Sequence, residues 1–301
     1  MLSRAFGTIA AVADLDLRVA VGSIYGFLGP NGSGKTTTIK MLLGLLTPDR
    51  GEISVFGSNP LRDRRAVLGR VGAMVEVPSL YGHLTGRENL EITRRLIGGI
   101  ERSAIDRALA LVDLRDAADR KVKGYSLGMK QRLSLALAMQ HNPDLLILDE
   151  PTNGLDPAGI REMRELIARL PREMGVTIFL SSHLLSEVEQ VATHVGIVNH
   201  GRLLFQGTLA ELHSKQALAL RLRVANVDSA LALLRRELWP QAMSNNGSIV
   251  GPIESEAVVP EIGRLLVNGG HDIYELRIEK PSLEASFLTM TASPTSAEVT
   301  P

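Results

Sequence analysis

The sequence of 301 residues contains no cysteine, which excludes disulfides and thiolate metal sites. It carries no net charge, since 33 basic residues balance 33 acidic ones, so no net field draws it to nucleic acid or to an anionic membrane. No apolar run reaches the ~18 residues that a membrane-spanning helix needs. The first residues show no basic flank before a long apolar stretch, so we expect no secretion signal. Together these absences favour a cytoplasmic protein that would need a separate partner for any membrane role.

Apolar segments of two kinds alternate along the first two thirds of the chain. Hydrophobic residues make up 45% of the sequence, which is typical of a globular chain with a sizeable core. We expect strands within 16–28, 145–148, 176–181 and 195–198, further strands and a turn at 51–75, and helices at 127–140, 158–170 and 184–193. This alternation predicts an α/β domain at 1–213, with a parallel sheet covered on both sides by helices.

A helical subdomain is predicted within this domain at about residues 77–140. Thr85 and Glu88 have the spacing of a capping box, and Ser103 with Asp106 offers a similar helix start.

After about residue 214 the pattern changes to strand, helix, turn, helix and strand. This order predicts a second, small α+β domain at 218–290. The tail 291–301 is polar and contains proline, so we expect it to be disordered.

The segment GPNGSGKTTT, residues 29–38, follows an apolar strand and precedes a helical segment. Gly29, Gly34, Lys35 and Thr36 satisfy the G-x-x-x-x-G-K-[ST] pattern of a phosphate-binding loop. Glycines let backbone N–H groups converge on phosphate oxygens, and the following helix adds the partial positive charge of its N-terminus. Lys35 can reach the β- and γ-phosphates of a nucleotide, and Thr36 can place its hydroxyl on Mg²⁺.

The segment LLILDEPTNGLDP, residues 145–157, runs from an apolar strand into two adjacent carboxylates, Asp149 and Glu150. A strand that is apolar on both faces is buried, and a buried carboxylate is costly unless something compensates its charge. We expect this strand to lie beside the strand before the phosphate loop, so that Asp149 holds Mg²⁺ directly or through water. Glu150 is then able to orient or deprotonate an attacking water.

Six segments, in order and at family-like spacing, resemble the ATP-binding subunits of ABC transporters over about residues 4–213. GPNGSGKTT is similar to Walker A, LLILDE to Walker B, YSLGMKQR to the signature motif, NGLD to the D-loop, and SSH, which ends at His183, to the H-loop. Phe6 in RAFG stands where the family has an aromatic residue that stacks on adenine. The resemblance implies a P-loop NTPase fold of the ABC type and the hydrolysis of ATP with Mg²⁺.

The resemblance also implies a role for each matching residue. Two chains would meet head to tail around two ATP molecules, with the signature helix of one chain gripping the γ-phosphate bound by the other. His183 would contact the γ-phosphate, and Asp156 would couple the two sites across the interface. The implied catalytic residues are Glu150, His183 and Lys35. The implied ATP-binding residues are Phe6, Gly29, Pro30, Asn31, Gly32, Ser33, Gly34, Lys35, Thr36 and Thr37, with Ser126 and Gly128 in trans. The implied Mg²⁺ ligands are Thr36, Asp149 and Glu76.

The sequence departs from the family pattern in three places. Glu76 stands where most members have a glutamine that contributes an oxygen to Mg²⁺ and senses the membrane partner; a carboxylate can also ligate Mg²⁺. Leu127 and Met129 replace a glycine and the glutamine of the signature. Only MLSRA precedes Phe6, so we expect either a start further upstream or a missing edge strand, and adenine stacking by Phe6 is then in question.

Glu76 and SLGMKQR together resemble the branch associated with exporters for bacitracin-like peptides and lantibiotics, which pair with six-helix permeases of the ABC-2 type. The resemblance implies a peripheral ATPase at the cytoplasmic face of the membrane. It would power the export of peptide antibiotics, drugs or lipids through a separate permease, and no nucleic-acid partner is expected. A complete set of catalytic residues permits a homodimer.

Three alternatives stay open. The first is a soluble ABC-type ATPase that acts on nucleic acid or ribosomes; a single cassette, no long heptad array and no net charge disfavour it. The second is an importer subunit, which the combination of Glu76 and SLGMKQR disfavours. The third is a regulator that binds nucleotide without hydrolysis, which the presence of both Glu150 and His183 disfavours.

Overall fold

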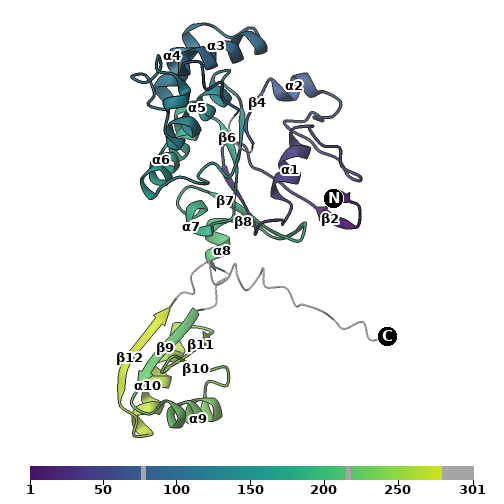
Figure 1. Cartoon of the computed structure of the whole chain (residues 1–301). Coiled ribbons are helices and arrows are strands. Elements are labelled where there is room, and N and C mark those ends of the chain that lie inside the picture. Colours follow the sequence, from purple (N-terminus) through teal and green to yellow (C-terminus); the bar gives the residue numbers. More distant parts are fainter. Residues whose placement is uncertain (76–78, 215–217, 280–301) are drawn as a thin grey trace. The chain divides into compact units, whose positions relative to one another are not determined.

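The computed structural model describes residues 1–75, 79–214 and 218–279, and the chain divides into two compact units between Leu209 and Ala210. Each unit has its own sheet and its own hydrophobic core (Figure 1). Within the described ranges, no helix is long and apolar enough to cross a lipid bilayer. Glu76 and the tail 291–301 lie outside the described residues, so the predictions made for them stay predictions.

A six-stranded sheet forms the centre of the first unit, in the order β4-β5-β6-β3-β7-β8. Neighbouring strands are parallel except β7 and β8, which are antiparallel. The strands are β3 (Ile24–Leu28), β4 (Val71–Met74), β5 (Leu145–Asp149), β6 (Thr177–Ser182), β7 (His194–Asn199) and β8 (Arg202–Thr208). β3 and β6 are buried along their whole length, because helices cover both faces of the parallel part of the sheet.

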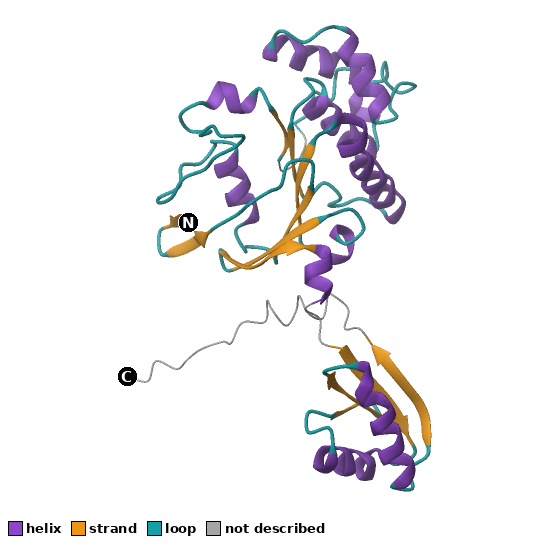
Figure 2. Cartoon of the chain, turned by 180° about the vertical axis from the view of Figure 1, so that it is seen from behind, coloured by secondary structure: helices purple, strands orange, loops and turns teal. Residues whose placement is uncertain are grey.

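The remaining elements of the first unit gather on the two sides of this sheet (Figures 1 and 2). On one side lie a two-stranded hairpin and two helices: β1 (Leu2–Phe6), β2 (Ile9–Leu15), α1 (Lys35–Leu42) and α2 (Arg64–Leu68). On the other side lie α3 (Gly86–Ile97), α4 (Ser103–Leu111), α5 (Leu127–Met139) and α6 (Pro157–Met174). Two short elements complete the unit, the 3-10 turn η1 (Val122–Gly124) and α7 (Leu185–Val188), and a further short helix, α8 (Leu209–Ser214), begins at the boundary between the two units.

Local sequence signals set the ends of two of these helices. The capping box predicted before α3 is present, because the Thr85 hydroxyl accepts from the Glu88 N–H while the Glu88 carboxylate accepts from the Thr85 N–H. α6 begins after Asp156, whose carboxylate accepts from the Gly159 N–H at 3.0 Å. The same helix ends at Gly175, which takes a left-handed conformation with φ 68°.

The strand order corrects the prediction that the strand ending at Asp149 lies beside the strand before the phosphate loop. β6 separates these two strands, since β5 pairs with β4 and β6 whereas β3 pairs with β6 and β7. The order of strands in a parallel sheet depends on the helical crossovers, which the local apolar pattern does not specify.

Other predictions were wrong in detail. Residues 16–23 form no strand, because the Arg18 N–H donates to Gln206 Oε1 and a turn with φ 75° at Gly22 follows. Within 51–75 only β4 is a strand, and the helix α2 was not predicted.

Of the two alternatives for the N-terminus, a start further upstream or a missing edge strand, the second was wrong, because the edge strand is present as β1 and pairs with β2. Ser103 does not cap α4 but is its first residue, and its hydroxyl bonds to Glu101 and Arg107. The helix predicted at 184–193 is only the short α7.

The second unit follows the order β9-α9-β10-β11-α10-β12, with an antiparallel sheet in the order β10-β11-β9-β12. The elements are β9 (Leu218–Val224), α9 (Val227–Glu237), β10 (Met243–Asn245), β11 (Ser248–Ile253), η2 (Glu256–Val258), α10 (Val259–Asn268) and β12 (Ile273–Glu279). This is the split β-α-β topology of ferredoxin-like domains. The Asn246–Gly247 turn joins β10 to β11, with φ 48° and 75° as a tight hairpin requires. Trp239 anchors the core, and its ring nitrogen donates to the Pro252 carbonyl at 2.7 Å.

His141, after α5, gives the first unit a predictable pH dependence. Its Nε2 donates to the Val71 carbonyl of β4 at 3.3 Å, and its Nδ1 is buried without a partner among the described residues. Burial lowers the pKa of the imidazole below its usual value. The unfolded state therefore takes up a proton at a higher pH than the folded state, so the stability from neutral His141 is lost as pH falls below about 6.5.

We expect the thermal unfolding temperature to fall more between about pH 7.5 and 5.5 in the native chain than in His141→Gln. Equal decreases in both proteins would contradict this account.

Candidate active site

The loop between β3 and α1 depends on two glycines that allow close backbone approaches. Gly34 has φ 105°, and a Cβ at this position would collide with the carbonyl oxygen of Ala11. A Cβ at Gly29 would collide with the Ser33 hydroxyl and with the Val198 carbonyl. The predicted phosphate loop therefore forms against β2 and β7, with its backbone at the N-terminus of α1, where N–H groups can converge on an anion.

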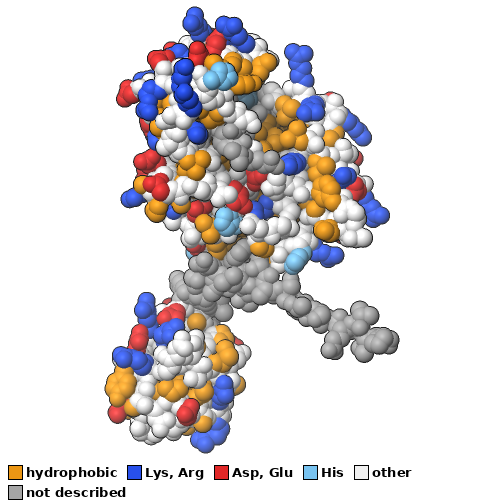
Figure 3. Space-filling view, in the orientation of Figure 1, with side chains coloured by type: hydrophobic (Ala, Val, Ile, Leu, Met, Phe, Trp, Pro, Cys, Tyr) orange, Lys and Arg blue, Asp and Glu red, His pale blue; other side chains and the backbone are white. Residues whose placement is uncertain are grey.

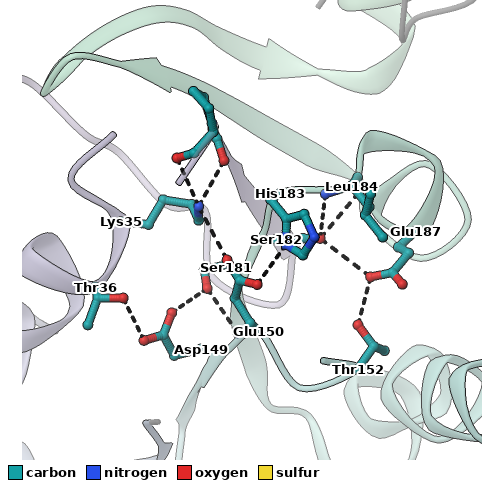
Figure 4. Close-up of polar contacts among 12 residues, drawn as sticks. Lys35, Thr36, Asp149, Glu150, Thr152, Ser181, Ser182, His183, Leu184 and Glu187 are labelled. Carbon is teal, nitrogen blue, oxygen red and sulfur yellow. Dashed lines mark hydrogen bonds and ion pairs between the residues drawn. The ribbon is translucent and has the colours of Figure 1, made fainter. Parts of the chain in front are cut away.

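Lys35, the first residue of α1, turns its ammonium back into the loop (Figure 4). Its Nζ donates to the Gly29 carbonyl at 2.8 Å and to the Pro30 carbonyl at 3.3 Å. Glu150 Oε1 lies 3.3 Å from the same nitrogen, and the Lys35 side chain is only 5% exposed. Two carbonyls and a carboxylate thus compensate a buried cation at the place where the sequence predicted contact with phosphates.

Asp149 ends β5 with both carboxylate oxygens engaged. Thr36 Oγ1 donates to Asp149 Oδ2 at 2.9 Å, and Ser181 of β6 donates to Oδ1. Ser181 is fully buried, and its hydroxyl also accepts from the Glu150 N–H at 3.0 Å. The structure therefore brings Thr36 and Asp149 together as predicted, although β5 is not adjacent to β3.

Glu150 follows in a left-handed conformation with φ 49°, which is strained for a residue with a side chain. This turn directs the Glu150 carboxylate between the Lys35 ammonium and the His183 imidazole. Oε1 pairs with Lys35, and Oε2 lies 2.7 Å from His183 Nδ1. His183 follows β6, so the three predicted catalytic residues come together at the carboxyl edge of the sheet, where an acid–base pair can act on a bound water.

Four further polar residues surround this edge and were not singled out from the sequence. Ser181 and Ser182 belong to the SSH segment, of which only His183 was assigned a role. Thr152 and Glu187 gave no signal, because a threonine in a turn and a glutamate in a short helix occur on any surface. The Thr152 hydroxyl donates to Glu187 Oε2 at 2.6 Å.

The residues predicted to act in trans or at the interface lie at the starts of α5 and α6, on the other side of the sheet from α1. Ser126 caps α5 by accepting from the Met129 N–H at 3.2 Å, and Asp156 caps α6. A Cβ at Gly128 would stand 3.8 Å from Leu155 Cδ2, so the start of α5 lies against the turn before α6. Ser126 and Asp156 are exposed, which leaves both able to meet another molecule.

Phe6 ends β1 with 49% of its surface exposed, and the Arg4 guanidinium lies 5.0 Å from the centre of its ring. One face of an aromatic platform is therefore occupied by a cation. Pro30, Asn31, Gly32 and Thr37 lie in or next to the loop, each of them exposed or half-buried.

The donors present fit both a phosphate and Mg²⁺. Ser33 Oγ is buried and has no hydrogen-bond partner among the described residues, so the loop holds a hydroxyl that an added oxygen can satisfy. Thr36 Oγ1 and Asp149 Oδ2 are hard oxygen ligands 2.9 Å apart. Adjacent ligands of an octahedral Mg²⁺ with bonds of ~2.0–2.1 Å are separated by about the same distance.

Comparison with known proteins agrees with this geometry. Residues 12–153 match the family model described as ABC transporter. The bacitracin transport ATP-binding protein BcrA of Bacillus licheniformis is 42% identical over 291 residues, which cover 96% of this chain and 95% of that protein. The daunorubicin/doxorubicin resistance ATP-binding protein DrrA of Streptomyces peucetius is 36% identical over 97% of this chain and 91% of its own length.

A solved structure shares the fold of the first unit. It is a dimeric ATP-binding cassette in a post-hydrolysis state with ADP and Pi, with a TM-score of 0.61 and 23% identity over 69% of this chain and 95% of that one. The phosphate loop, the paired carboxylates and the full-length similarity lead to one conclusion: the chain belongs to the ATP-binding proteins of ABC transporters and hydrolyses ATP for transport.

Proposed function

We propose that this ATPase powers export through a separate membrane-embedded permease of the ABC-2 type, and that its cargo is a peptide antibiotic or a drug. The relatives named for bacitracin transport and for daunorubicin/doxorubicin resistance support this cargo class. Charge supports a protein partner over nucleic acid, since the net charge is zero and basic and acidic side chains are interspersed on the face of the first unit seen in Figure 3. The chain would then act at the cytoplasmic face of the membrane.

The observation that carries the proposed mechanism is the Glu150 carboxylate between Lys35 and His183. On this proposal Lys35 leaves Glu150 to neutralise the β- and γ-phosphates, because a phosphate brings more negative charge than one carboxylate. Glu150 then accepts a proton from the attacking water. His183 holds the Glu150 carboxylate and the water in line with the γ-phosphate.

The same proposal gives Thr36 and Asp149 the task of holding Mg²⁺, while the Ser181 hydroxyl fixes the Asp149 carboxylate. When bound, Mg²⁺ would neutralise charge on the transferring phosphoryl group. Glu76 remains a proposed third ligand, outside the described residues.

A dimer would complete the site. ABC ATPases dimerise and pair with membrane components, and the solved cassette with ADP and Pi is a dimer. In a head-to-tail homodimer, Ser126 and Gly128 at the N-terminus of α5 would face the γ-phosphate held by Lys35 of the other copy. Asp156 would lie at the same interface, because the turn before α6 packs against the start of α5.

Glu150→Gln tests the proposed water activation. The amide keeps the size of the side chain but removes the base, so we expect turnover to fall at least about 100-fold while ATP binding persists. With ATP and Mg²⁺ this variant should accumulate as a dimer, measured by light scattering after size-exclusion chromatography. Native turnover in the variant, or a persistent monomer both alone and with its membrane partner, would contradict the proposal.

Mixing two inactive variants tests the head-to-tail arrangement. Lys35→Ala damages the loop side of each site, and Ser126→Arg damages the helix side. If each site uses Lys35 of one copy and Ser126 of the other, a mixed dimer has one intact site and one doubly damaged site. An equimolar mixture should recover roughly a quarter of native turnover, whereas sites built from one copy alone would recover none.

Affinity purification from detergent-solubilised membranes distinguishes transport from the soluble alternative. Tagged Glu150→Gln, held closed by ATP, should retain an integral-membrane protein of six predicted spans, and should lose it when ATP is replaced by ADP. Recovery of RNA or ribosomal proteins in its place, in an RNase-sensitive manner, would favour an ATPase that acts on nucleic acid.

A further inference from the structure

Glu187, on the short helix α7, bridges the two segments that carry Glu150 and His183 (Figure 4). Its Oε2 accepts from the Thr152 hydroxyl at 2.6 Å and lies 3.4 Å from the Ser182 hydroxyl. Thr152 follows β5 and Ser182 ends β6, so one carboxylate oxygen contacts the end of each strand. Hydrogen bonds to an ionised acceptor are stronger than those between neutral groups.

On the β5 side, Thr152 lies inside the turn that begins at the proposed base. The Asn153 N–H donates to the Glu150 carbonyl at 3.1 Å, which closes this turn around Thr152. Glu150 itself is in the left-handed region with φ 49°, a conformation that persists only when surrounding contacts hold it. Thr152 is buried, with 9% of its surface exposed, and its hydroxyl donates to the Glu187 carboxylate.

On the β6 side, Ser182 closes a turn around His183. The Leu184 N–H donates to the Ser182 hydroxyl at 3.0 Å, a side-chain turn that encloses the residue between them. The Ser182 oxygen is therefore fixed relative to the His183 backbone. Glu187 reaches this oxygen and the Thr152 hydroxyl with the same atom, so it links the two turns directly.

We propose that Glu187 is a positioning residue for ATP hydrolysis: by joining Thr152 to Ser182 it holds Glu150 and His183 at the separation their contact requires. It does not touch the reacting atoms, and it acts through the two turns. The inference rests on the proposed roles of Glu150 and His183. A shift of ~1 Å between catalytic groups can cost about 100-fold in rate, so loss of this link should appear in turnover and not in binding.

Steady-state ATPase kinetics of the full chain test the proposal. Glu187→Ala should lower kcat about 10- to 100-fold, with KM within about twofold of native, because the phosphate loop lies elsewhere. Glu187→Gln should stay within about threefold of the native kcat, since the amide oxygen can accept both hydrogen bonds. Thr152→Val should lower kcat, and Thr152→Val combined with Glu187→Ala should be no slower than the slower single variant, because both remove the same link.

Glu189→Ala is the matched control, because this glutamate is two residues away and the described part of the chain gives it no side-chain hydrogen bond or ion pair. It should keep native kinetics.

Three outcomes would overturn the inference. They are a native kcat in Glu187→Ala, equal losses of kcat in Glu187→Gln and Glu187→Ala, or a Glu187→Ala protein in which a lower kcat comes with a higher KM and a lower thermal unfolding temperature. If Glu150→Gln also turns over normally, the proposed function fails; if Glu150→Gln is inactive and Glu187→Ala is not, only this inference fails.

Discussion

The shared carboxylate of Glu150 is the contact on which the site depends. It joins three segments that are distant in sequence: the start of α1 through Lys35, the end of β5, and the residue after β6 through His183. A buried ammonium without a counter-charge would be strongly destabilising, so the pair that compensates Lys35 also assembles the catalytic edge. Because parallel strands end at one edge of a sheet, the fold delivers these groups to the same place.

How much of this site can be predicted depends on how far apart in the sequence the interacting residues are. The phosphate loop is local: the pattern from Gly29 to Thr36 specifies both the turn and the chemistry, and the structure has that turn. The pairing of Thr36 with Asp149 was also predicted, although for a wrong reason, since β6 intervenes between β5 and β3. The contact survives because α1 packs against β5, a long-range contact that local patterning does not reveal.

The link from Thr152 to Glu187 marks where such prediction stops. The two residues are 35 positions apart, and each residue type is common on protein surfaces, so neither one alone indicates the link.

The second unit shows the opposite case. Its turn at Asn246–Gly247 and its alternating outer strands are local signals, and these elements formed where the pattern placed them, whereas the strands β10 and β11 on either side of the turn were not predicted. The buried residues of its core are all different from those of the ATPase unit's core.

The close approach of Gly34 to Ala11 couples the hairpin to the loop. The Ala11 carbonyl is also crowded by Gly201, where a Cβ would stand 2.8 Å away, and the Gly201 N–H donates to the Ser33 carbonyl at 3.0 Å. The backbone of β2 at Ala11 is thus in close contact with Gly34 and Gly201, and neither glycine has a side chain that could move to make room. Phe6 ends the other strand of this hairpin, so the hairpin fixes where the Phe6 ring stands relative to the phosphate loop. A ligand that needed a different spacing between this ring and the loop would have to move β2 against the backbone of Gly34 and Gly201.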